Sequence, residues 1–378
     1  MLVNAKRYLE QSAHSEQRGK VSESKNYLKK ALKVTTAEYG EVHPDVYKVL
    51  SNLAVHYAVQ GKYAEAEPIF IRALEIGRKT LKEDDPGICN ALSNLANLYT
   101  YWNRFDDAET LHKKALEIRI KAYGDNHTEV ATSYNNLAIL YENQEKYFDA
   151  ETLYQKALNI WLTNENQKIM YVALAKNNLA NIYLKEGKFD EAEALYKEAI
   201  NIGKTKYIWE NSEFTAFLNN FAYLYIKKGN FEKAEEILKE LLGIYKKYKG
   251  LNNINLALAY ENLADIYEYR KEYFKSGNYF RKTLDVYFKL KDYRNSKAII
   301  SLINKLSYVY SVQEKKDELA KTLKNYQKIL EGGLPEDNEI LIYIADCIKE
   351  LPNQSNISKN TFTVHNIIIV ITAFCHYL

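Results

Sequence analysis

The chain has 378 residues, 47% of them hydrophobic, and a formal net charge of +3 from 52 basic and 49 acidic residues. This near balance excludes the clustered basic surface that nucleic-acid binding requires, so we expect no nucleic-acid partner. With only 5 Pro and 14 Gly residues, the composition favours an almost wholly helical protein.

The cysteines and the N-terminal residues indicate whether the protein has disulfides or a zinc site and whether it is secreted. Cys89, Cys347 and Cys375 lie far apart and are odd in number. Neither a disulfide framework nor a zinc site can be built from that spacing. Residues 1–20 lack the apolar segment of a secretory signal peptide, which predicts a cytoplasmic protein.

In chain order, the first recognisable element is a helix beginning near Val21, with apolar residues at helical spacing through Val34. A longer pattern then takes over: the tripeptide Asn-Leu-Ala, or a close variant, recurs every 42 residues. It begins at Asn52, Asn94, Asn136, Asn178, Asn220 and Asn262, and a tyrosine follows each at Tyr57, Tyr99, Tyr141, Tyr183, Tyr225 and Tyr267. Six such steps without an insertion indicate one helical unit stacked on itself.

Each unit has the pattern of two helices joined by a short turn. In the first complete one, Leu53, Ala54 and Tyr57 mark one face of a first helix. Gly61 suits the left-handed residue that ends a helix. A second apolar stripe follows, formed by Tyr63, Ala66, Phe70, Ala73, Leu74 and Ile76. The small alanines allow the two helices to approach closely, and the hairpin cannot bury its face alone.

The pattern weakens at both ends of the array. Leu306, Ser307 and Tyr310 continue it at a spacing of 43, and Glu339 to Leu351 is predicted to be a last capping helix. We therefore predict a repeat array over 1–351, with clear repeats at about 18–290 and a degenerate repeat with a capping helix at 291–351. Residues 352–378 form a polar linker and a short hydrophobic tail.

The repeated residues resemble the tetratricopeptide repeat, whose usual period is ~34 residues. The longer period is similar to the subtype found in kinesin light chains and many bacterial scaffold proteins, with its inter-helix signature at 43–46 (HPDV), 85–88 (DPGI) and 127–130 (HTEV). The resemblance covers roughly residues 18–330. It implies an all-α fold, a right-handed superhelical solenoid of seven or eight helix-turn-helix repeats. His43 and His127 are expected to cap backbone donors in these turns, as is Asp85.

In tetratricopeptide arrays the first helices line a concave groove in which peptides usually lie. Carried over, this places a set of amides and two lysines in a peptide-binding groove: Asn52, Asn94, Asn97, Asn135, Asn136, Asn177, Asn178, Asn181, Lys185, Asn219, Asn220, Lys227 and Asn262. Asparagine is unfavourable within a helix, so its repetition calls for a role. Two interpretations stay open: the amides hold an extended peptide backbone, or they bond the neighbouring helix and set the superhelical step. Lys185 and Lys227 either attract acidic ligand residues or are ordinary solvated lysines.

The sequence contains no pattern typical of an enzyme, a cofactor-binding protein or a metal-binding protein. The seven histidines are scattered singly, and no phosphate loop, catalytic cluster or set of metal ligands is present. We therefore predict no catalytic residues, cofactor or metal, and a non-catalytic scaffold that binds a protein or peptide. The alternative is a peptide-sensing regulator that changes superhelical shape. Because the repeats begin within about twenty residues, we expect no separate effector domain of ~50 residues before them.

The tail differs from the repeats. Residues 353–363 are polar, whereas 367–378 are apolar and rich in isoleucine. Twelve residues are too few for a membrane-spanning helix of ~20, so we do not expect membrane attachment. Packing on the last repeat or disorder remain the two interpretations.

Overall fold

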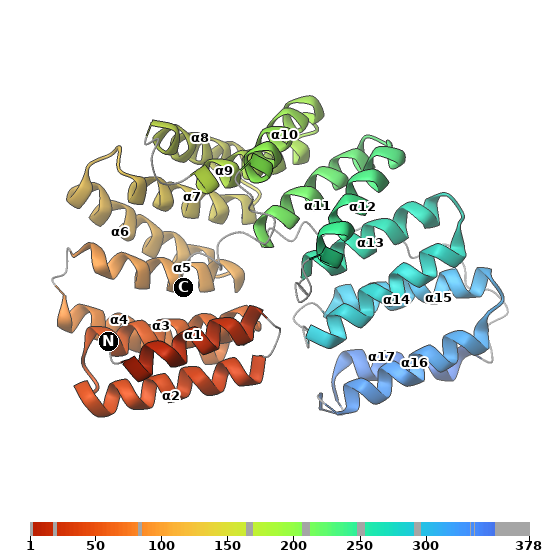
Figure 1. The fold of residues 1–378 in the computed structure, drawn as a ribbon, viewed down its shortest axis with the longest axis horizontal. Coiled ribbons are helices and arrows are strands. Elements are labelled where there is room, and N and C mark those ends of the chain that lie inside the picture. Colours follow the sequence, from red (N-terminus) through yellow and green to blue (C-terminus); the bar gives the residue numbers. More distant parts are fainter. Residues whose placement is uncertain are drawn as a thin grey trace. The chain divides into compact units, whose positions relative to one another are not determined.

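A computed structural model describes residues 3–17, 21–81, 85–163, 169–205, 212–247, 254–290, 296–332, 334–335 and 337–351. The described part is helical throughout, with seventeen α-helices and one short 3-10 helix (Figure 1). The chain divides into two compact units, the first reaching Asn220 and the second beginning at Phe221. The predicted all-α repeat fold is confirmed.

In the first unit the helices follow in pairs. They are α1 (Val3–Gln17), α2 (Val21–Tyr39), α3 (Pro44–Val59), α4 (Tyr63–Thr80), the 3-10 helix η1 (Pro86–Ile88), α5 (Cys89–Tyr101), α6 (Phe105–Tyr123), α7 (Thr128–Asn143), α8 (Tyr147–Thr163), α9 (Ile169–Lys185) and α10 (Phe189–Thr205). Each odd-numbered helix pairs with the even-numbered helix after it, and that helix packs on the first helix of the next pair from α2·α3 to α8·α9. Helix α11 (Ser212–Lys227) starts in the first unit and ends in the second.

The second unit continues the alternation. Its helices are α12 (Phe231–Lys247), α13 (Ile254–Tyr269), α14 (Tyr273–Leu290), α15 (Ser296–Val312), α16 (Lys316–Glu331) and α17 (Glu339–Glu350). Helix α13 pairs with α14, α12 packs on α13, and α14 packs on α15. Helix α17 covers most of the segment Glu339–Leu351 that is predicted to cap the array.

The N-terminal helix α1 forms a hairpin with α2, although the sequence pattern showed only the second of the two. Its buried positions carry the small residues Ala5, Ser12 and Ser15 in place of large apolar ones. Ser12 contacts Ser24 of α2, with 2.8 Å between the two hydroxyl oxygens. A helix that packs through serine and alanine has a weak apolar periodicity, and for that reason hydrophobic spacing did not reveal it.

The alanines predicted to let helices approach are fully buried. Ala54, Ala66 and Ala73 have no exposed surface, and Phe70 fills the adjoining space. In α14, Ser276 and Thr283 take two of these alanine positions and are equally buried. A larger side chain at these sites would separate the helices. The close spacing of the two helix backbones therefore requires a small residue, and serine or threonine can take the place of alanine.

The three expected caps in the inter-helix turns are confirmed. Nδ1 of His43 accepts a hydrogen bond from the Asp45 amide at 3.1 Å, and Nδ1 of His127 accepts one from the Glu129 amide at 3.2 Å. Asp85 caps η1 by accepting from the Gly87 amide at 2.8 Å. Each histidine ring also stacks on a tyrosine, Tyr39 or Tyr123. The caps therefore fix the starts of α3, η1 and α7.

From the α3–α4 hairpin to the α15–α16 hairpin, each turn between the two helices contains one residue with positive φ at the same position of the repeat. These residues are Gly61, Asn103, Glu145, Gly187, Gly229, Lys271 and Glu314. The left-handed region costs a residue with a Cβ about 1–2 kcal/mol, and glycine escapes that cost. The sequence revealed only the three glycines, because glycine is the residue type that signals such a turn.

Replacing Lys271 with glycine should therefore stabilise the protein. We expect Lys271→Gly to raise the free energy of unfolding by about 0.5 kcal/mol. Glycine relieves the backbone strain at this turn, but its greater flexibility in the unfolded chain offsets part of that gain. Gly187→Ala at the matching position should lower it by about 1 kcal/mol. Urea unfolding of both variants measures this pair, and equal midpoints for Lys271→Gly and the parent would contradict the strain argument.

Among the helices that the structure describes, none combines the length and the apolar composition needed to cross a bilayer. The predicted linker and hydrophobic tail, 352–378, lie outside the described residues.

Candidate ligand-binding face

The predicted groove residues lie on the first helices of successive hairpins. They are Asn52 on α3; Asn94 and Asn97 on α5; Asn135 and Asn136 on α7; Asn177, Asn178, Asn181 and Lys185 on α9; Asn219, Asn220 and Lys227 on α11; and Asn262 on α13. In the first unit α3 packs on α5 and α5 on α7, which brings their asparagines onto neighbouring helices. Lys227 and Asn262 belong to the second unit. We call the six asparagines that open the repeated tripeptide the ladder asparagines.

Three ladder asparagines of the first unit have unused amides. The side-chain amides of Asn52, Asn94 and Asn136 form no hydrogen bond to any residue that the structure describes, and the same holds for the side chain of Asn97. Asn52, Asn94 and Asn97 are half-buried, while Asn136 is buried. A side-chain amide that is buried or half-buried destabilises the protein unless water or a ligand provides hydrogen-bond partners for its two donors and its acceptor.

Other predicted amides bond within the protein. Asn220 donates from Nδ2 to Oδ1 of Asn177 at 3.2 Å, linking α11 to α9 within the first unit. Oδ1 of Asn181 accepts a 2.5 Å hydrogen bond from the buried Tyr196 hydroxyl. Asn178 has no exposed surface at all. The hydrogen bonds of Asn220 and Asn181 agree with the second interpretation, in which the side-chain amide bonds a neighbouring helix.

Buried amide atoms without partners accompany this set. Oδ1 of Asn135 and Nδ2 of Asn178 are inaccessible and have no hydrogen-bond partner among the described residues. Leaving such a group unsatisfied costs about 1–3 kcal/mol. The middle of the asparagine set is therefore richer in polar groups than the protein alone satisfies.

Lys185 lies in a buried ion pair. Its Nζ is 3.1 Å from Oε1 of Glu142, a residue with almost no exposed surface. The hydroxyl of Tyr154 donates to the other carboxylate oxygen at 2.9 Å. Burial, and then the Glu142 carboxylate, hold the pKa of Tyr154 well above its usual value, so the hydroxyl keeps the proton that it donates. Lys227, at the matching repeat position, is exposed.

In the second unit, a lysine replaces the ladder asparagine at the last step of the repeat. Asn262 is half-buried on α13, and the next step, 43 residues on, is Lys305 of α15. Lys305 Nζ lies 2.8 Å from Oδ1 of Asp265 and 3.4 Å from Oε1 of Glu261. Burial raises the pKa of both carboxyl groups against the opposing effect of Lys305. The Lys305 ammonium thus forms ion pairs with two side chains of α13, Glu261 and Asp265.

Glu268, one turn beyond Asp265 on α13, adds a third carboxyl group. Burial, followed by the Asp265 carboxylate, raises the pKa of Glu268 to about 7, against the opposing effect of Lys305. The folded protein therefore retains this proton over a pH range in which the unfolded chain, where the glutamate has its ordinary pKa of 4.5, has released it.

This shift predicts a pH dependence near neutrality. The contribution of Glu268 is fully present below about pH 4.5 and is lost as the pH rises through about 7, because the folded state binds the proton more tightly. We expect wild type to lose stability relative to Glu268→Gln between roughly pH 5 and 8, measured as urea midpoints.

A second carboxylate provides the control for this experiment. Hydrogen bonds hold the pKa of Glu235 at about 2, so its contribution is already complete above about pH 5. Glu235→Gln should therefore shift the stability curve without changing its slope in this range. Parallel curves for wild type and Glu268→Gln would contradict the assignment of the titration to Glu268.

A repeated hydrogen bond joins consecutive repeats and was missed in the sequence. The tyrosine that follows the repeated tripeptide donates its hydroxyl proton to a glutamate on the second helix of the preceding repeat. The pairs are Tyr99 to Glu67 at 2.8 Å, Tyr141 to Glu109 at 3.0 Å, Tyr183 to Glu151 at 2.8 Å and Tyr267 to Glu235 at 2.7 Å. Tyr99 and Tyr267 are buried and Tyr141 and Tyr183 are half-buried, and the hydroxyl groups of all four also fix the register between repeats.

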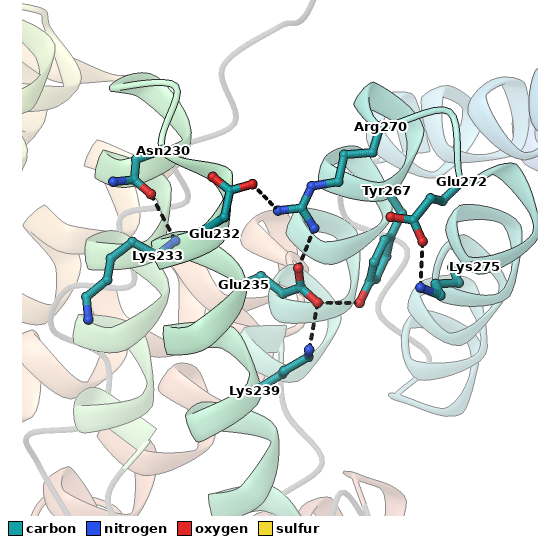
Figure 2. A network of polar contacts seen from close by, with 9 residues as sticks. All are labelled: Asn230, Glu232, Lys233, Glu235, Lys239, Tyr267, Arg270, Glu272 and Lys275. Carbon is teal, nitrogen blue, oxygen red and sulfur yellow. Dashed lines mark hydrogen bonds and ion pairs between the residues drawn. The ribbon is translucent and has the colours of Figure 1, made fainter.

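Figure 2 shows the fullest version of this contact, between α12 and α13. Glu235 accepts from the Tyr267 hydroxyl, from Arg270 at 2.5 Å and from Lys239 at 2.7 Å, while Arg270 also reaches Glu232. Burial alone would raise the pKa of Glu235, but the hydrogen bonds from Lys239, Tyr267 and Arg270 lower it. The carboxylate therefore stays ionised at any physiological pH.

The sequence contained a signal for these pairs. Glutamates recur at the 42-residue period at 67, 109, 151, 193 and 235, each four residues after the first residue of a second helix. The period of these glutamates coincides with that of the apolar residues and the asparagines, so the glutamates are as much a part of the repeat as those residues are. Among the described residues, no group of three or more His, Cys, Asp or Glu side chains is placed to hold a metal ion.

Comparison with known proteins agrees with the repeat pattern. A family model described as tetratricopeptide repeat matches residues 45–121, 104–163 and 213–289, and a second model of the same description matches 172–207. No curated protein matches the chain.

The chain also matches solved structures, among them the following three. The quorum sensor NprR from B. thuringiensis, in its apo form, is 17% identical, with 86% of each chain covered and a TM-score of 0.55. The apo form of RapI is 15% identical, covering 76% of this chain and 99% of that one, with a TM-score of 0.53. A putative kinesin light chain of Podosopora anserina is 22% identical, covering 54% of this chain and 97% of that one, with a TM-score of 0.44.

Proposed function

Since the chain belongs to the tetratricopeptide repeat family, we propose that it is a non-catalytic scaffold that binds an extended protein segment or peptide along its first helices. The observation that carries this proposal is the unused amides of Asn52, Asn94 and Asn136 on the neighbouring helices α3, α5 and α7. Each amide offers two donors and one acceptor, which match the N–H and C=O groups of a peptide backbone.

The spacing of the helices suits an extended ligand. Neighbouring packed helices lie about 8–10 Å apart, and an extended chain advances ~3.3–3.6 Å per residue. Successive ladder asparagines would therefore meet about every third residue of the ligand. Backbone contacts at that interval give affinity with little dependence on ligand sequence, as a scaffold with several partners requires.

The experiment uses peptides selected from a displayed random library against the full chain. We expect Asn94→Ala/Asn136→Ala to weaken binding of the selected peptides at least tenfold, since two backbone-binding amides are removed. Asn159→Ala, an exposed asparagine on the second helix α8, is the matched control and should leave affinity unchanged. Equal affinities for the double variant and the control, at equal thermal stability, would refute the role of the amides.

The second candidate function is a peptide-sensing regulator. It is supported by the likeness of fold to NprR, a protein described as a quorum sensor. Scaffold and sensor differ in whether the array changes its dimensions on binding. Solution scattering with and without a selected peptide distinguishes them: an unchanged radius of gyration supports the scaffold, and a changed one supports the sensor.

A further inference from the structure

Four lysines lie on the side of α2 that faces away from the core. They are Lys25, which is half-buried, and the exposed Lys29, Lys30 and Lys33. The opposite side of the helix is buried and carries no charged residue. Since residues four apart are neighbours on a helix surface, three of these lysines form one line along α2, and Lys30 lies beside it. We call the four residues the lysine face.

The lysine face is not neutralised within the described part of the protein. None of its four ammonium groups forms an ion pair or a hydrogen bond with a residue that the structure describes. Two of them lie over aromatic rings: Lys25 Nζ is 4.8 Å from the centre of the Tyr57 ring, and Lys30 Nζ is 5.6 Å from that of Tyr27. Such contacts hold a cation in place but leave its charge uncompensated.

Later second helices carry an ion pair at the matching positions. Glutamates stand at the position of Lys25, at 67, 109, 151, 193 and 235. In α6, α10 and α12 this glutamate pairs with the lysine four residues on, which stands at the position of Lys29. The ammonium nitrogen lies 2.6 Å from the carboxylate oxygen in α6 and 2.7 Å from it in both other helices. In α2, two like charges replace this pair, an arrangement that destabilises a helix.

Lys33 repeats the reversal of charge. Glu75 of α4 and Glu117 of α6 stand at its position. The four positions of the lysine face therefore hold two glutamates and two lysines in α6, but four lysines in α2. The repeat thus has a charge pattern that stabilises the second helix, and α2 departs from it without a compensating contact among the described residues. A carboxylate-bearing partner outside the chain would supply that compensation.

We propose that the lysine face of α2 binds an acidic segment of another protein. Lys29 and Lys33 are separated by ~6 Å along the helix axis, and alternate side chains of an extended chain are ~7 Å apart on one side. Carboxylates at every second residue of an extended segment therefore match the line of lysines. Four cations are fewer than the about six to ten phosphate contacts typical of a nucleic-acid site. The face belongs to a second helix, so it is separate from the ladder asparagines of the first helices.

Binding of a short labelled oligoglutamate peptide to the full chain at low ionic strength tests the proposal. We expect Lys25→Glu/Lys33→Glu to weaken binding at least tenfold, because the face then carries as many carboxylates as ammonium groups. The variant should be at least as stable as the parent, since it has the charge pattern of α6. Fluorescence anisotropy gives the affinities, and thermal unfolding checks the fold.

A matched control separates the lysine face from the net charge of the protein. Lys79→Glu/Lys156→Glu changes the net charge equally through exposed lysines of α4 and α8, and it should bind as the parent does. Equal losses in the two double variants, or no binding by the parent, would overturn the proposal. So would an affinity that does not fall with added salt. Tighter binding of a single-stranded oligonucleotide of equal charge, lost in Lys25→Glu/Lys33→Glu, would assign the face to nucleic acid instead.

Discussion

Lys185→Ala is expected to lower the free energy of unfolding by about 3 kcal/mol, far more than a lysine substitution normally does. The substitution leaves the Glu142 carboxylate buried, and among the described side chains the Tyr154 hydroxyl is then its one remaining hydrogen-bond partner. Removing one member of a buried ion pair is costly because the other charge remains without compensation. Urea unfolding of the variant measures the loss.

The repeat provides a matched control for this prediction. Lys227 occupies the same repeat position on α11 but is exposed, so Lys227→Ala should change stability by less than about 0.5 kcal/mol. Equal effects of the two substitutions would show that Lys185 acts as an ordinary surface lysine. That result would return it to the set of candidate ligand contacts.

A combined variant separates the ion pair from its position. Leu184 and Phe280 are the natural occupants of the positions that match Glu142 and Tyr154 in other repeats. The variant Glu142→Leu/Tyr154→Phe/Lys185→Met should recover most of the stability lost in Lys185→Ala, because no charge remains buried. If the combined variant is as unstable as the single one, packing and not charge limits this site.

Gly203→Ala is expected to destabilise the first unit by about 1–3 kcal/mol or more. A Cβ at Gly203 would lie 2.1 Å from Cδ2 and 2.4 Å from Cε2 of the Phe214 ring. Phe214 is fully buried, so the ring cannot move aside without displacing its neighbours. Thermal unfolding and hydrogen exchange of α10 and α11 measure the effect.

Gly77 occupies the same repeat position in α4 and gives the opposite expectation. The nearest atom to an added Cβ there is Ile88 Cγ1 at 3.7 Å, an ordinary contact. Gly77→Ala should therefore stabilise the helix by about 0.5–1 kcal/mol through the reduced flexibility of the unfolded chain. Destabilisation of similar size by both substitutions would contradict the assignment of the clash to Phe214.

The two glycines show where prediction from sequence stops. The period identifies the position as one on a second helix, but its occupants include Gly77, Arg119, Trp161 and Gly203. Their neighbours differ from repeat to repeat: Gly77 lies near Ile88 of η1, Arg119 donates to Ser133 of α7 at 2.7 Å, and Trp161 stacks on a tyrosine of α9. Each residue fits one local partner, so the repeat pattern does not specify it.

The ladder asparagines divide in the same way. Their spacing predicted a shared place on the first helices, and the structure places Asn52, Asn94 and Asn136 there with unused amides. The same pattern did not distinguish Asn220, whose amide bonds Asn177, or the fully buried Asn178. Their binding role stays a prediction that the peptide experiment tests.

The sequence by itself determined the helical repeat, its 42-residue period, the buried alanines and the glycine turns. These features follow from backbone geometry that every hairpin shares, so they recur in the sequence. Only the tertiary structure decided which polar side chains are bonded, such as Lys185 to Glu142, and which glycine is closely packed. Those outcomes depend on side chains that meet across two repeats, and a local periodic pattern carries no information about that pairing.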